Sequence, residues 1–92
     1  MQVNFERAIA QLMKRWEEMT KGEKPLHVEI ITYWPNGQDV KYIACIMCHA
    51  NDLHEAVTFQ NFNGAAKWIA SKITAMIETE FYERQEENKE NA

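Results

Sequence analysis

The stretch HVEIITYWPNGQDVKYIACIMCH, residues 27–49, decides the fold of this chain. It contains two runs rich in β-branched and aromatic residues, separated by the tripeptide Pro35-Asn36-Gly37. Such runs favour strands, and proline followed by asparagine and glycine is typical of a tight turn. The stretch therefore predicts a β-hairpin with a three-residue loop.

Alternation along the hairpin predicts two different sheet faces. With a three-residue loop, Thr32 would oppose Val40 and Ile30 would oppose Tyr42. The core face would carry Val28, Ile30, Thr32, Trp34, Val40, Tyr42, Ala44 and Ile46. The other face would carry His27, Glu29, Ile31, Tyr33, Lys41, Ile43, Cys45 and Met47. This second face is too polar for a deep core and too apolar for a fully solvated sheet, so we expect it to bind a partner.

Apolar residues before and after the hairpin predict the remaining elements. Helical spacing extends from an N-cap at Asn4 to about Lys21 and resumes at residues 63–83, with residues 54–60 alternating as a third strand. The second helix would bury a stripe of Ile69, Ile73, Ile77 and Phe81. The order α-β-β-β-α predicts one α+β domain, residues 1–83, with a three-stranded antiparallel sheet and both helices on one face. Residues 84–92 are expected to form a charged flexible tail.

The composition indicates a small intracellular protein. The chain has 92 residues, of which 46% are apolar, enough for one domain with a packed core. It has no basic segment followed by an apolar run and no apolar stretch of about 18 residues, so we expect a cytoplasmic location, no membrane contact and reduced cysteines. The net charge of −4 opposes non-specific binding to phosphates.

The string CIMCH, residues 45–49, matches the spacing by which haem is attached to cysteines. In a strand, however, residues three apart point to opposite faces, which opposes haem attachment. It also opposes a zinc site of Cys45, Cys48, His49 and His54, whose ligands only a bulge near His49 would bring together. The expected register also sets His27 opposite Cys45 beside Glu29, an arrangement found in nucleophilic sites. A flat strand face offers no free N–H groups for an oxyanion. We therefore expect no cofactor, no metal, no small-molecule substrate and no enzymatic activity.

The α-β-β-β-α order resembles that of double-stranded RNA-binding domains, which grip phosphates with lysines at the start of the second helix. Here that position reads NGAAK, residues 63–67, and contains a single lysine. The family's phosphate-binding lysines therefore do not carry over. A small RNA-binding module that uses Lys67 and Lys72 stays the alternative function.

A basic group, Lys14, Arg15, Lys21 and Lys24, lies toward the end of the first helix. Cations at this end also complement the helix dipole, so the group can serve the helix as well as a ligand. We expect its charges to lie near the mixed sheet face and to reach phosphates of an RNA that a partner already holds.

An acidic α+β domain of this size without a catalytic motif resembles the small inhibitors encoded by phages, anti-CRISPR proteins among them. The resemblance is one of type over the whole chain. It implies a non-catalytic inhibitor that binds a CRISPR effector ribonucleoprotein complex, preferably of type I-F, and blocks target DNA binding. The residues expected to touch the partner are Lys14, Arg15, Lys21, Glu29, Ile31, Tyr33, Asn36, Lys41, Lys67 and Lys72. Closure of the mixed sheet face into a homodimer is the other use of that surface.

Overall fold

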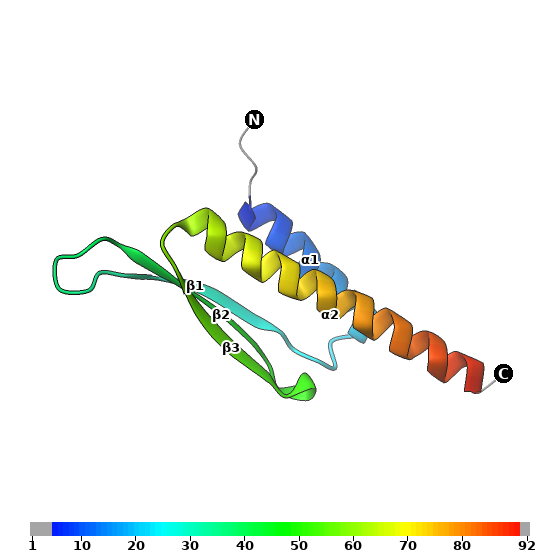
Figure 1. The fold of residues 1–92 in the computed structure, drawn as a ribbon. Helices are drawn as coiled ribbons and strands as arrows, with labels where there is room; N and C mark the ends of the chain where they lie inside the picture. Colours follow the sequence, from blue (N-terminus) through cyan, green and yellow to red (C-terminus); the bar gives the residue numbers. More distant parts are fainter. Residues whose placement is uncertain (1–4, 91–92) are drawn as a thin grey trace.

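The computed structural model describes residues 5–90, and the side chains of residues 5–87. The elements are α1 (Phe5–Thr20), β1 (His27–Tyr33), β2 (Lys41–Cys48), the short 3-10 helix η1 (His49–Asn51), β3 (Leu53–Phe59) and α2 (Phe62–Glu90). The strands form an antiparallel sheet in the order β1-β2-β3, and both helices lie on one face of it (Figure 1). The predicted architecture is confirmed, while the predicted N-cap Asn4 lies outside the described residues.

Trp16 fixes the end of α1 to the segment that follows. Its side chain is 1% exposed, and its indole N–H donates a hydrogen bond to the backbone carbonyl of Lys24 at 2.8 Å. The buried Thr20 hydroxyl donates to the carbonyl of Trp16 at 2.9 Å. The helix ends where Gly22 adopts a φ of 71° and its N–H donates to the carbonyl of Glu17 at 3.0 Å. This left-handed ending turns the chain toward β1.

The tip of the hairpin differs from the prediction in its register. Tyr33 pairs with Lys41 and Thr32 pairs with Tyr42, so residues 34–40 form the connection in place of a three-residue loop. The expected pairing of Thr32 with Val40 is therefore wrong by two residues. Because side chains alternate with a period of two, this shift leaves every residue of the paired strands on its predicted face.

The turn itself lies where the sequence predicted it. Asn36 and Gly37 have φ values of 44° and 77°, and the N–H of Gln38 donates to the carbonyl of Pro35 at 2.8 Å. Trp34, which was expected in the core, is 71% exposed. The tip projects beyond the helices (Figure 1), and the described residues leave this ring largely uncovered.

The core lies between α2, β2 and the inner side of α1. Its buried members are Trp16, Ala44, Ile46, Cys48, Ala65, Ile69, Ile73 and Ile77. The predicted stripe on α2 is thus confirmed at its three isoleucines but not at Phe81, which is 49% exposed. The inward position after Ile77 is taken by Glu80.

Helix α2 is longer than the sheet that it covers. It begins at a cap formed by Asn61, whose side-chain oxygen accepts a hydrogen bond from the N–H of Gly64 at 2.7 Å. It continues through Glu90, past the end predicted near Glu83. Its 29 residues span about 44 Å, against about 27 Å for an eight-residue strand, so its last part, the α2 overhang (residues 81–90), extends beyond the sheet (Figure 1). Neither α1 nor the described α2 has the apolar length that a membrane crossing requires.

Candidate interaction surface

One whole face of the sheet is left uncovered by the described residues, because both helices pack on the other face (Figure 1). The observed register places on it His27, Glu29, Ile31, Tyr33, Lys41, Ile43, Cys45, Met47, His54, Ala56 and Thr58. We call this set the open sheet face. It contains all the residues of β1 and β2 that the alternation predicted for it.

The open sheet face has an apolar centre and a charged rim. Ile31 pairs directly with Ile43 across the two strands, and Ile31 and Tyr33 are 42% and 48% exposed. Glu29 and Lys41 lie on either side of this centre along the strands. Apolar and aromatic side chains inside a polar rim are the composition of protein interfaces.

The nucleophilic arrangement anticipated on this face does not form. His27 pairs with Met47, whereas Cys45 pairs with Glu29, so the expected His27–Cys45 pair is wrong for the same reason as the hairpin register. The imidazole Nε2 of His27 lies 3.8 Å from a carboxylate oxygen of Glu29, and both side chains are exposed. The thiol therefore has no histidine directly across the strand pair.

The two cysteines lie on opposite faces of β2, as the alternation predicted. Cys48 is fully buried on the core face, with its Sγ 4.0 Å from the carbonyl of Lys24, and Cys45 is half-buried on the open sheet face. Across the described part of the chain, no group of three or more His, Cys, Asp or Glu side chains could hold a metal ion.

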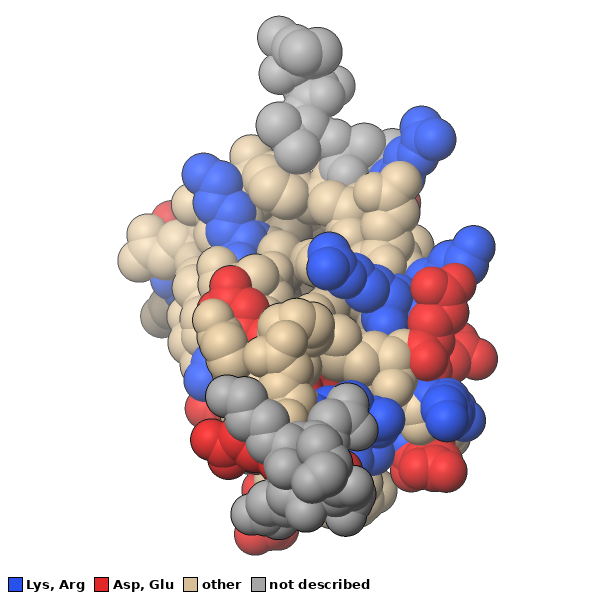
Figure 2. Space-filling view, turned by 90° about the vertical axis from the view of Figure 1, so that its right-hand side faces the viewer, with Lys and Arg blue, Asp and Glu red and all other residues tan. Residues whose placement is uncertain are grey.

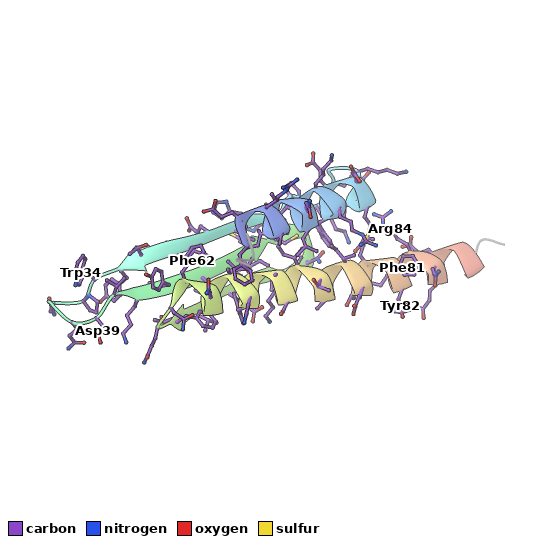
Figure 3. The ribbon with its side chains drawn as sticks, turned by 90° about the horizontal axis from the view of Figure 1, so that it is seen from above. Trp34, Asp39, Phe62, Phe81, Tyr82 and Arg84 are labelled. Atoms are coloured by element: carbon purple, nitrogen blue, oxygen red, sulfur yellow. The ribbon has the colours of Figure 1, made fainter. Side chains whose placement is uncertain are left out.

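The structure brings together only some of the residues predicted to touch a partner. Glu29, Ile31, Tyr33 and Lys41 share the open sheet face. Asn36 lies at the hairpin tip beyond the paired strands, where Trp34 and Asp39 mark the same end of the molecule (Figure 3). Lys14, Arg15, Lys21, Lys67 and Lys72 belong to the helices or their ends. Because the helices cover the opposite face, these cations do not join the open sheet face.

The cations of α1 alternate with acids instead of forming a purely basic surface. A shallow depression at the end of α1 is lined by Lys14, Glu17, Glu18 and Lys21 together with Gly22. Figure 2 shows Lys and Arg side chains interspersed with Asp and Glu on the side of the molecule at which α2 ends. A surface of alternating charge attracts phosphates less than a continuous basic surface does.

On α2, Lys72 already has partners within the chain. Its ammonium lies 2.9 Å from a carboxylate oxygen of Glu55 and 5.5 Å from the ring centroid of Trp68. Lys67 is exposed. A phosphate at Lys72 would have to compete with the Glu55 carboxylate.

Reasoning from the sequence missed a buried carboxylate at Glu80. One of its oxygens accepts a hydrogen bond from the Lys24 ammonium at 2.8 Å, and the other accepts one from Nε of Arg84 at 3.0 Å. The hydrogen bond from Lys24 lowers the pKa of Glu80 from its usual range; burial acts in the opposite direction, and Arg84 lowers it further. No sequence motif marks this contact, because residues 24 and 80 meet only in the folded chain.

Reasoning from the sequence also missed an aromatic pair at the start of the α2 overhang. Phe81 and Tyr82 are 49% and 65% exposed, with ring centroids 5.8 Å apart at an interplanar angle of 73°. Both project from the helix at the end of the molecule opposite the hairpin tip (Figure 3). The four-residue spacing had predicted that Phe81 is buried. It is exposed because the sheet beneath α2 ends before this residue, which the spacing does not indicate.

Comparison with protein-family models, with curated proteins and with solved structures found no match for this chain.

Proposed function

We propose that this protein is a non-catalytic inhibitor that binds a CRISPR effector ribonucleoprotein complex through the open sheet face. The observation that supports it is the uncovered apolar centre formed by Ile31, Tyr33 and Ile43. An uncovered, three-stranded face suits the surface of a macromolecule, whereas small molecules bind in concave pockets that enclose them. The proposal places the protein in the cytoplasm, where such a complex meets its target DNA.

The distribution of size and charge supports the same proposal. Tyr33 is a large, half-exposed ring at the last position of the edge strand β1, and tyrosine is among the residues that dominate binding energy at interfaces. The exposed Trp34 follows it and can extend the contact beyond the sheet. The net charge of −4 complements a partner surface that is basic because it binds nucleic acid.

The test is co-purification with a type I-F effector complex, followed by measurement of target DNA binding in a mobility-shift assay. We expect Tyr33→Ala to weaken inhibition by roughly 30-fold, the effect of removing one interface residue worth about 2 kcal/mol. The matched control is Tyr82→Ala, which removes the same side chain from the other end of the molecule and should leave inhibition unchanged. Equal losses in both variants, or no association with the complex, would refute the proposal.

Two further measurements separate the alternatives. Salt-sensitive binding to naked duplex RNA, lost in Lys67→Glu and without effect on the effector complex, would assign the chain to the RNA-binding alternative. A stable dimer in analytical ultracentrifugation, dissociated by Tyr33→Ala, would assign the open sheet face to a second copy of the chain. Either result would replace the inhibitor proposal.

A further inference from the structure

A groove separates α1 from the edge of the sheet. β1 is an edge strand, with β2 on one side and no strand of the described chain on the other. α1 packs closely on α2 and makes no comparable contact with β1. A groove of about 350 Å³ is left between them. The unpaired edge of β1 therefore lies next to the groove.

The groove is apolar inside and acidic at its rim. Ile9 and Met13 of α1 and Val28 and Ile30 of β1 line it, and all four side chains are half-buried. The charged residues that line it are Glu6 and Glu29, both exposed and without a lysine or arginine among the lining residues, and the side chain of Glu29 points to the open sheet face. Its chemistry fits an apolar side chain accompanied by positive charge.

The other edge of the sheet is built differently. Beside β3, an ion pair between Glu55 and Lys72 joins the strand to α2 at 2.9 Å. The depression on that side is lined by charges of both signs, which include Lys24, Glu80 and Glu83. Charged side chains along an edge discourage strand pairing. Along β1, the charged contact of Glu29 is with His27 of the same strand, at 3.8 Å, and does not reach α1.

We propose that the β1 edge binds an extended, basic segment of a partner by strand addition. A strand added about 4.8 Å from β1 would lie beneath α1, and every second side chain would point into the groove. Backbone hydrogen bonds to β1 supply affinity, and the groove selects apolar residues at those alternate positions. Lys or Arg at the intervening positions lies on the same side of the sheet as Glu29 and is attracted by it, while Glu6 attracts positive charge at the rim of the groove. This site is separate from the apolar centre of the open sheet face and does not depend on the function proposed for that face.

The probe is the peptide acetyl-Lys-Val-Lys-Ile-Lys-Val-Lys-amide, titrated into the isotope-labelled protein and followed by NMR. We expect amide shift changes concentrated in β1, together with changes at the methyl groups of Ile9 and Met13. Two N-methylated forms of the peptide test the hydrogen bonding, because alternate N–H groups of a strand point to opposite sides. Methylation of one alternating set should abolish binding, and methylation of the other set should leave it intact.

A pair of double variants tests the charge of the rim. Glu6→Lys with Glu29→Lys should weaken peptide binding by about tenfold, as expected for two exposed charge contacts. Glu18→Lys with Glu23→Lys makes the same change in net charge away from the groove and should leave the affinity within about twofold. Equal weakening in both double variants, shift changes centred on β3 or β2, equal affinity of both N-methylated peptides, or no binding at millimolar peptide would overturn the proposal.

Discussion

Trp16 and Trp34 place the same side chain in opposite surroundings, 1% and 71% exposed. We expect Trp16→Ala to lower the free energy of unfolding by about 3–5 kcal/mol, because it empties a core position and removes the donor that pairs with the Lys24 carbonyl. Trp34→Ala should stay within about 0.5 kcal/mol of the unmodified protein. Urea unfolding measures both. A comparable loss in Trp34→Ala would show that the hairpin tip packs against the fold.

Glu80 makes stability depend on pH in a defined direction. Its pKa in the folded protein is lowered, chiefly by the hydrogen bond from Lys24, below the value of about 4.3 that glutamate has in an unfolded chain. The ionised carboxylate therefore stabilises the fold fully above the unfolded pKa, and this contribution is lost as pH falls through the folded pKa. The side chain is 6% exposed, so its hydrogen bonds are poorly replaced by water.

The variant Glu80→Gln tests this dependence. At pH 7 it should unfold about 1–3 kcal/mol more easily than the unmodified protein, because bonds to a charged acceptor are lost. The difference between the two proteins should shrink as pH falls below about 4. Glu83→Gln removes an exposed carboxylate from the same helix and serves as the control. A difference that stays constant from pH 7 to pH 3 would exclude the ionised Glu80 as its source.

The two thiols should differ in reactivity because they occupy opposite faces of β2. Cys45 is half-buried on the open sheet face, whereas Cys48 is fully buried beside the Lys24 carbonyl. We expect a thiol reagent to label one cysteine quickly in the folded protein and two after denaturation. The fast phase should vanish in Cys45→Ser and persist in Cys48→Ser. Fast labelling of Cys48 would mean that the core opens on the timescale of labelling.

Among the elements, α2 has two parts that differ in what they contact. The first part covers the sheet, whereas the overhang follows Glu80, and its Arg84 donates a hydrogen bond to Glu80 of the same helix. We expect truncation after Arg84 to reduce the helical circular dichroism signal while leaving the melting temperature nearly unchanged. Truncation after Glu83 also removes the Arg84–Glu80 bond and should lower stability by less than about 1 kcal/mol. A large fall in melting temperature for the first truncation would show that the overhang packs in solution.

The elements were predictable where local pattern decides them and unpredictable where tertiary contact does. Alternation assigned the faces of β1 and β2 correctly, but it could not fix the register, because a shift of two residues keeps every side chain on the same face. The spacing of Ile69, Ile73 and Ile77 predicted a buried stripe, and these residues are buried. Phe81 continues the same spacing but is exposed. Periodicity in the sequence does not indicate where the neighbouring sheet ends, so it could not predict this exposure.

At the scale of the whole molecule, the residues of the open sheet face could be predicted, but which other predicted residues lie near that face could not. Its mixed composition is visible in the alternation of the hairpin. The cations of α1 were expected near it, yet they belong to the helix layer, which lies on the other side of the sheet. The groove beside β1 depends on the packing of α1 against α2, which no local pattern in the sequence of either helix predicts. The candidate surfaces could therefore be identified only from the arrangement of the helix and sheet layers in the folded chain.

The order of the elements, in which α2 follows the sheet, has a consequence for biosynthesis. The sheet forms from neighbouring segments, but its core side is closed by Ile69, Ile73 and Ile77, which are among the last core residues to be made. A nascent chain that has emerged only as far as β3 exposes Ala44 and Ile46 to water and lacks the partner of α1. The core of this domain can therefore close only after α2 has emerged from the ribosome.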